Sequence, residues 1–150
     1  MKDLSALSVK DSMTANVLVI EQTRTIGEFI ERLDAAKVHG MPVIDDKKRV
    51  VGVVSLTDMV KAEHSHMKFP GFYTSDAIWP FVENQFESIL HRQIGDIMTR
   101  EVISCRQSDT LAEAARIFAR HGVHRLLVLD DKEEMQGILS VIDVVRAMVD

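Results

Sequence analysis

Gly52-Val-Val-Ser-Leu-Thr-Asp58 returns later in the chain as Gly137-Ile-Leu-Ser-Val-Ile-Asp143, and this repetition decides the fold. The two motifs lie 85 positions apart, and the same offset pairs His39 with His124 without a gap. A repeat at a fixed register indicates two copies of one supersecondary unit, each with an apolar face that a neighbour can cover. The sequence therefore predicts a duplicated protein with two equivalent sites.

The composition is that of an ordinary globular protein. Of the 150 residues, 46% are hydrophobic and 27% are charged, so the chain is long enough to bury a core. The net charge of -5 and the scattered Lys and Arg residues argue against nucleic acid as a partner. We find neither a secretory leader nor a run of about 20 apolar residues that could span a membrane, so we expect a cytoplasmic protein without membrane contact. Cys105 is the single cysteine, which excludes an internal disulfide and fits a small core residue.

Each copy is predicted to contain a strand, a helix, two strands and a second helix. The first helix is marked by Thr25-Ile-Gly-Glu28 and Thr110-Leu-Ala-Glu113, which are capping boxes followed by apolar residues at helical spacing. Short β-branched runs on either side of a polar turn predict a hairpin. In the first copy we place strands at 17–20, 41–44 and 50–55 and helices from 26 and from 56; in the second, strands at 102–105, 126–129 and 135–140 and helices from 111 and at 141–149.

This order of elements predicts an α+β fold with a small mixed sheet in each repeat and helices gathered on one side of it. So short a sheet leaves an apolar face uncovered, and we expect the other repeat to cover it with pseudo-twofold symmetry. The expected domains are a first repeat at 1–65, a linker at 66–93 and a second repeat at 94–150. Within the linker, an amphipathic helix over about 75–92 carries Trp79 and Phe86 and packs either on the protein's own core or on a second protomer.

Ser55 and Asp58, like Ser140 and Asp143, stand where a strand passes into a helix. In one interpretation they are helix caps, in which the serine hydroxyl accepts a helix amide and the aspartate reaches back. In the other they hold a ligand, because helix N-terminal amides and a serine hydroxyl can bind phosphate, while the carboxylate can accept both hydroxyls of a ribose. The motif alone is weak evidence. Found twice in register after matching strands, it favours a nucleotide.

Two further pairs of motifs accompany the repeated one. Asp11-Ser-Met-Thr14 matches Asp96-Ile-Met-Thr99, and Met41-Pro-Val-Ile-Asp45 matches Leu126-Leu-Val-Leu-Asp130. With the Gly-to-Asp motifs they resemble the cystathionine-β-synthase (CBS) domain, and the chain is similar to a stand-alone tandem pair, the Bateman module. The resemblance spans nearly everything except the linker. The linker's Trp79 is in turn similar to the insert of small plant CBS-pair proteins and their bacterial relatives.

The resemblance implies a regulatory module for signal transduction that binds an adenosine-containing ligand (AMP, ADP, ATP or S-adenosylmethionine) in clefts between the repeats. Binding would modulate a protein partner allosterically, and the module would form a homodimer. By motif position, the implied ligand contacts fall into three groups. They are Asp58 and Asp143 for ribose; Ser55, Ser140, His39, His124 and Arg125 for phosphate; and Thr14, Ala15, Asn16, Val17, Thr99, Arg100, Glu101 and Val102 along the adenine.

Two other classes of function stay open. The chain could be a structural protein–protein interaction module with unoccupied clefts, in which the Ser and Asp residues serve only as caps. An enzyme is the third alternative, but we find no nucleophile with a base, no paired carboxylates and no Gly-rich lysine loop, so no catalytic residue is assigned. The pair His64 and His66 lacks further ligands nearby in the sequence, and no metal is predicted.

The two copies also differ in ways that bear on their sites. Leu127 replaces Pro42 in the hairpin, and Lys37 stands where the second copy has Gly122. The two clefts therefore need not be equally competent, and one bound nucleotide per chain is as plausible as two.

Overall fold

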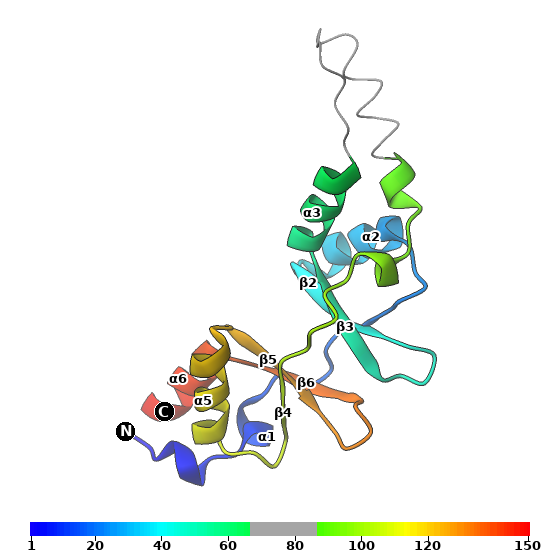
Figure 1. The fold of residues 1–150 in the computed structure, drawn as a ribbon. Helices are drawn as coiled ribbons and strands as arrows, with labels where there is room; N and C mark the ends of the chain where they lie inside the picture. Colours follow the sequence, from blue (N-terminus) through cyan, green and yellow to red (C-terminus); the bar gives the residue numbers. More distant parts are fainter. Residues whose placement is uncertain (67–86) are drawn as a thin grey trace, which may run out of the picture. The chain divides into compact units, whose positions relative to one another are not determined.

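The computed structural model describes residues 1–66 and 87–150, which form two compact units (Figure 1). Among the described residues, the Asp58 unit consists of 19–45, 51–66 and 87–100, and the Asp143 unit consists of 1–18, 46–50 and 101–150. Each unit is described here by itself. Of the predicted linker helix over about 75–92, residues 75–86 lie outside the described residues, residues 87–90 are helical, and residues 91–92 form a turn and a bend.

The Asp58 unit is built on a three-stranded sheet in the order β1-β2-β3. Strand β1 runs parallel to β2 and pairs Ile20 with Val43. The core of this unit gathers Ile20, Phe29 and Val43, all fully buried, together with neighbouring apolar side chains. Its elements are β1 (Ile20–Glu21), α2 (Ile26–Ala36), β2 (Gly40–Ile44), β3 (Val50–Ser55), α3 (Leu56–His66) and the 3₁₀ turn η2 (Ile94–Asp96).

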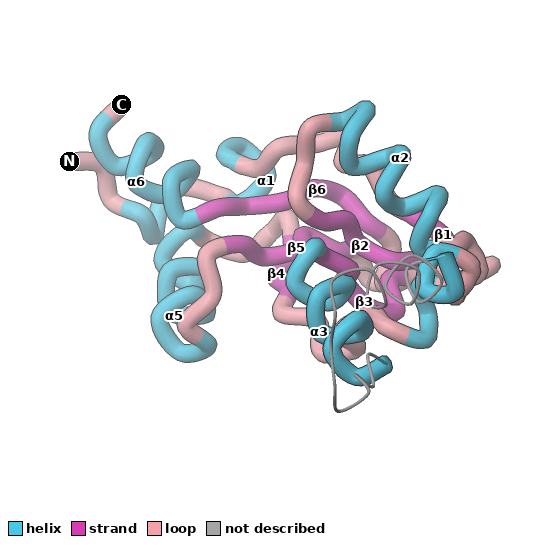
Figure 2. The backbone as a smooth tube through the Cα atoms, turned by 90° about the horizontal axis from the view of Figure 1, so that it is seen from above, coloured by secondary structure: helices cyan, strands magenta, loops and turns pink. Residues whose placement is uncertain are grey.

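The Asp143 unit repeats this arrangement with the order β4-β5-β6. Strand β4 is parallel to β5, and β5 is antiparallel to β6, so the sheet is mixed; Figure 2 draws its strands in magenta. Leu111, Leu126 and Leu139 are fully buried in its core. Its elements are η1 (Leu4–Ala6), α1 (Val9–Ser12), β4 (Ser104–Arg106), α5 (Leu111–His121), β5 (Arg125–Leu129), β6 (Met135–Ser140) and α6 (Val141–Val149).

The predicted α+β class and the order strand, helix, strand, strand, helix are confirmed in both units. The strand expected at residues 17–20 is wrong over most of its length, because β1 contains only Ile20 and Glu21. The boundary between the units falls between Leu18 and Val19, inside that apolar run, and Leu18 is 56% exposed. Here β-branched composition marks a connecting segment, which local propensity cannot separate from a strand.

The two predicted capping boxes are present. In α2 the Thr25 amide donates to the Glu28 carboxylate over 2.9 Å, and the Glu28 amide donates to the Thr25 hydroxyl over 3.2 Å. In α5 the same exchange joins Thr110 and Glu113, over 2.7 and 3.2 Å. Each box satisfies two of the amides that a helix start leaves without an intrahelical partner, which explains where both helices begin.

Each unit combines the sheet of one repeat with the segment that leads into the other repeat. Val9, at the start of the first repeat, is fully buried in the core of the Asp143 unit, where its amide donates to the Asp109 carbonyl over 2.9 Å. Its counterpart Ile94 is fully buried in the core of the Asp58 unit, where its amide donates to the Arg24 carbonyl over 2.9 Å. The compact units therefore cut across the repeats that the sequence displays.

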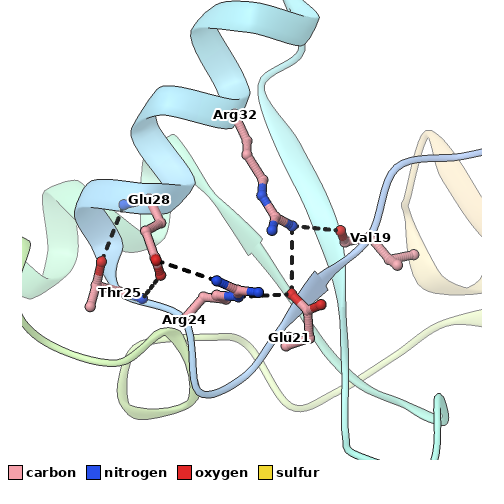
Figure 3. A network of polar contacts seen from close by, with 6 residues as sticks. All are labelled: Val19, Glu21, Arg24, Thr25, Glu28 and Arg32. Carbon is pink, nitrogen blue, oxygen red and sulfur yellow. Dashed lines mark hydrogen bonds and ion pairs between the residues drawn. The ribbon is translucent and has the colours of Figure 1, made fainter.

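A surface network surrounds the start of α2 (Figure 3). Glu21 pairs with Arg24 over 3.4 Å and with Arg32 over 3.6 Å, and Arg32 also donates to the Val19 carbonyl over 3.2 Å. A backbone hydrogen bond, aided by the two arginines, holds the pKa of Glu21 below its ordinary value. These side chains are between about a third and a half exposed, so the network adds little to stability, as is usual for surface ion pairs.

Helices α2 and α5 end at equivalent residues with a left-handed backbone. Lys37 has φ 53° and ψ 44°, and Gly122 has φ 63° and ψ 30°. Glycine adopts this conformation without strain, whereas a lysine does not. The Lys37 and Gly122 difference thus concerns helix termination, and the Pro42 and Leu127 difference concerns two buried strand positions.

Cys105 is buried in the core of the Asp143 unit, as predicted. Loss of water around the thiol raises its pKa to about 11, so it stays protonated and unreactive at neutral pH. Across residues 1–66 and 87–150, no helix has the length and apolar character that crossing a membrane requires.

Candidate functional site

In the Asp143 unit, the repeated motif forms the junction between β6 and α6. Ser140 caps the helix: its hydroxyl accepts the Asp143 amide over 3.2 Å, while its own amide and hydroxyl donate to Asp143 Oδ2 over 2.7 and 2.6 Å. The other carboxylate oxygen, Oδ1, faces Arg146 Nη1 at 3.8 Å. The carboxylate therefore keeps one oxygen directed away from its cap.

In the Asp58 unit, the same motif joins β3 to α3. The Ser55 amide and hydroxyl donate to Asp58 Oδ2 over 2.8 and 3.1 Å. In this unit Oδ1 also accepts a hydrogen bond, from the Thr99 hydroxyl over 2.8 Å. Asp58 is 8% exposed, so its carboxylate is both more buried and more fully hydrogen-bonded than that of Asp143.

The two motif glycines admit a second backbone beside the strand. Thr99 exchanges two backbone hydrogen bonds of 2.9 Å with Val53, next to Gly52. A Cβ on Gly52 would lie 2.7 Å from the Thr99 carbonyl oxygen, and one on Gly137 would lie 2.7 Å from the Thr14 carbonyl oxygen. The chain itself approaches closely at these glycines, which leaves no room for a side chain.

The histidines and arginine predicted to reach phosphate lie beside the N-termini of α3 and α6. The His39 carbonyl accepts the amide of Leu56, the first residue of α3, over 3.1 Å, and the His124 carbonyl accepts the amide of Val141, the first residue of α6, over 3.1 Å. Arg125 pairs with Ser140 in the ladder between β5 and β6. The side chains of His39, His124 and Arg125 are exposed. His39 lies next to the N-terminus of α3, and the other two lie next to the N-terminus of α6.

The segments expected to border the adenine divide between the units. Thr14, Ala15, Asn16 and Val17 belong to the Asp143 unit, where Thr14 pairs with Ile138 through backbone hydrogen bonds of 2.8 and 2.9 Å. Thr99 and Arg100 belong to the Asp58 unit, whereas Glu101 and Val102 belong to the Asp143 unit. The structure thus brings Thr14 into the unit of Asp143 and Thr99 into that of Asp58, a crossed pairing that the sequence order does not reveal.

Asp58 also borders a cavity of about 220 Å³ within its own unit. Pockets for whole drug-sized ligands are usually about 300–1,000 Å³, so this space could hold only part of a nucleotide. Its wall contains both carboxylates and cations, which suits a polar fragment. The lining residues are Asp58, Lys61, Ala62, Arg92, Asp96 and Ile97.

Two functional details escaped the sequence-based prediction. One is the hydrogen bond that the Thr99 hydroxyl donates to Asp58, because Thr99 was expected to border the adenine. The other is the cation one turn after each aspartate, Arg146 beside Asp143 and Lys61 beside Asp58. The repeat register that matches Asp58 with Asp143 also matches Lys61 with Arg146, so that signal was present in the sequence.

The chain has a duplicated α+β fold with a Ser–Asp junction at the start of the last helix in each copy, and this architecture defines a class of tandem-repeat modules. The chain belongs to the CBS domain family, and the sequence model of that family matches residues 8–65 and 94–150. The matched ranges include both Ser–Asp junctions and leave out the linker. The resemblance inferred from the motifs is confirmed.

Known relatives are similar in sequence to this chain over most of its length. The protein MJ1426 of Methanocaldococcus jannaschii is 27% identical over 94% of this chain and 90% of its own length. The chloroplastic CBS domain-containing protein CBSX2 of Arabidopsis thaliana is 31% identical over 93% of this chain, which spans 63% of that protein. A crystal structure of CBSX2 in complex with AMP matches with a TM-score of 0.72 at 30% identity, covering 96% of this chain and 97% of that one.

Proposed function

We propose that this chain is a regulatory module that senses an adenosine-containing nucleotide and passes the signal to a protein partner. The observation that carries the proposal is the Ser–Asp junction present in both units, with Thr99 paired beside the one and Thr14 beside the other. Helix amides and a serine hydroxyl suit a phosphate, and a carboxylate one turn on suits a ribose. A nucleotide carries both groups.

The AMP complex of CBSX2 supports this choice of ligand, because the CBSX2 structure is 30% identical in sequence over 96% of this chain. Under the proposal, Asp58 and Asp143 bind ribose, while Ser55 and Ser140 contact phosphate. The His39, His124 and Arg125 side chains add charge or hydrogen bonds to the phosphate. The segments at 14–17 and 99–102 border the adenine. No catalytic residue is assigned.

A ligand panel tests the proposal directly. Thermal unfolding and titration calorimetry with AMP, ADP, ATP, S-adenosylmethionine and NADH would rank the ligands. A ligand present at 100 times its dissociation constant should add about 2.7 kcal/mol to the free energy of unfolding. If none of these compounds raises the melting temperature or releases heat, the sensor function is wrong.

Two single variants then separate binding from capping. Asp143→Ala and Asp58→Ala should each remove nucleotide affinity at one site if the carboxylates bind ribose. Ser140→Ala removes the hydroxyl that caps α6, so it should lower the free energy of unfolding by about 1 kcal/mol and also weaken the proposed phosphate contact, while Asp143 stays available to the ribose. Unchanged affinity in both aspartate variants would contradict the assignment of the ribose contacts.

A specific observation favours a second candidate, a structural interaction module. The Ser140–Asp143 pair forms a complete capping box from groups of the chain alone. The motif would then need no ligand to account for its residues. This alternative predicts that the aspartate variants lose stability and that no nucleotide binds, so the same experiments decide between the two.

We further propose that the chain forms a homodimer, as the family resemblance implies. Size-exclusion chromatography with light scattering, with and without AMP, measures its molecular mass. A coupling of about 1–3 kcal/mol between ligand binding and partner binding would be typical of an allosteric response. A monomer at all concentrations would contradict the homodimer.

A further inference from the structure

We propose that the two sites are unequal and that Thr99 is the residue that weakens ribose binding at Asp58. This inference rests on the proposed function and names the site that fills first, which is the one at Asp143. It is drawn from the hydrogen bonds that each carboxylate already accepts within its own unit. The two units are compared at equivalent positions of the repeat.

An ionised carboxylate has about four acceptor positions, two on each oxygen. Asp58 already fills at least three of them, with two hydrogen bonds from Ser55 on Oδ2 and one from the Thr99 hydroxyl on Oδ1. About one position is left. A ribose presents two hydroxyl donors to a carboxylate, so at Asp58 one of them competes with the Thr99 hydroxyl on Oδ1 or with the Ser55 hydroxyl on Oδ2.

Asp143 accepts two hydrogen bonds on Oδ2, both from Ser140, and Oδ1 accepts none from the rest of the described chain. The nearest cation to Oδ1, Arg146 Nη1, is 3.8 Å away, which is beyond hydrogen-bond distance. Both positions on Oδ1 are therefore open to a ribose diol. The side chain of Asp143 is 18% exposed, whereas Asp58 as a whole is 8% exposed.

The phosphate end of the site shows the same bias. Arg125 lies in the ladder opposite Ser140, but its counterpart in the Asp58 unit is Gly40. A Cβ at Gly40 would lie 2.8 Å from the Val54 carbonyl oxygen, so that position admits no cationic side chain. An arginine can bind phosphate through two hydrogen bonds. The Asp143 unit thus has an arginine opposite its junction serine that the Asp58 unit lacks.

The test isolates the Asp58 site and removes the competing donor. In an Asp143→Ala background, Thr99→Val keeps the shape of the side chain and deletes its hydroxyl. Calorimetry with AMP and with 2′-deoxyadenosine monophosphate measures the affinity and the preference for the second ribose hydroxyl. Thr99→Val should tighten AMP binding by about three- to ten-fold, the worth of one hydrogen bond, and should raise the AMP to deoxy-AMP ratio.

Thr99→Ser in the same background restores the hydroxyl and should return the weak binding and the low ratio. Circular dichroism melting confirms that each variant is folded. This inference is overturned if the unmodified chain binds AMP but Thr99→Val leaves the AMP to deoxy-AMP affinity ratio unchanged or lowers it. The proposed function would still stand in that case. No AMP binding by the unmodified chain would overturn the proposed function, and this inference with it.

Discussion

Lys37→Gly should stabilise the protein, because Lys37 holds a left-handed backbone at the end of α2. An L-residue in this conformation costs about 1–2 kcal/mol relative to the right-handed region. Glycine removes that cost but adds about 0.5–1 kcal/mol of chain entropy to the unfolded state. The net gain should be about 0.5–1 kcal/mol.

Gly122 provides the reciprocal measurement. It occupies the equivalent position at the end of α5 with φ 63°, and a Cβ added there would meet no atom within 4 Å. Gly122→Ala therefore tests the backbone cost without a steric clash, and it should lower the free energy of unfolding by about 1 kcal/mol. The opposite signs at two matched positions make the pair more informative than either variant.

Urea unfolding followed by far-ultraviolet circular dichroism measures both variants. In a thermal melt of the same variants, a change of 1 kcal/mol in the free energy of unfolding would shift the melting temperature by about 2–4 °C for a chain of this size. Lys37→Ala is the control, since it removes the lysine side chain and keeps the Cβ; it should change stability by less than about 0.5 kcal/mol. If Lys37→Gly is neutral or destabilising while Lys37→Ala is neutral, the strain argument is refuted.

Two further predictions concern close packing and pH. Gly52→Ala should lower the free energy of unfolding by about 1–3 kcal/mol, because the new Cβ would lie 2.7 Å from the Thr99 carbonyl oxygen. The same change at Gly27, where the nearest atom to an added Cβ is 3.4 Å away, should be neutral or stabilising in the same urea assay. Equal losses at both glycines would contradict the steric reasoning. For Glu113, the hydrogen bond from the Thr110 amide holds the pKa below its ordinary value of 4.5. The folded state then binds this proton less readily than the unfolded state, so the stabilising contribution is full above the ordinary pKa and is lost as the pH falls through the lower, folded pKa. Melting temperatures from about pH 3 to 6 should fall less steeply in Glu113→Gln than in the unmodified chain, and parallel curves would rule this out.

Much of the fold could be predicted from the sequence because the signals are local. The capping boxes at Thr25 and Thr110 placed the starts of two helices, since a cap depends only on residues within one turn. Strands β3 and β6 and helix α6 have the predicted limits. The run at 17–20 was predicted as a strand because β-branched composition alone does not separate a strand from an apolar connection.

The residues of the candidate site were also identifiable from the sequence, because the fixed register matched Ser55 with Ser140 and Asp58 with Asp143. Their partners were not. Thr14 and Thr99 are the same residue type at equivalent positions, yet the hydrogen bond of 2.8 Å joins Thr99 to Asp58. A difference of this kind depends on side-chain placement across segments 41 positions apart in the chain, which no local pattern encodes.

The sequence by itself determined that this protein is a pair of CBS repeats with a Ser–Asp junction in each copy. Periodicity, caps and the register of the repeat act over short distances and are written in the chain directly. Only the tertiary structure decided that Val9 and Ile94 exchange sheets, so that each repeat's leading segment completes the core of the other. The physical reason is that both cores are apolar sites of the same kind, so hydrophobic pattern alone cannot say which of two similar cores a segment will enter.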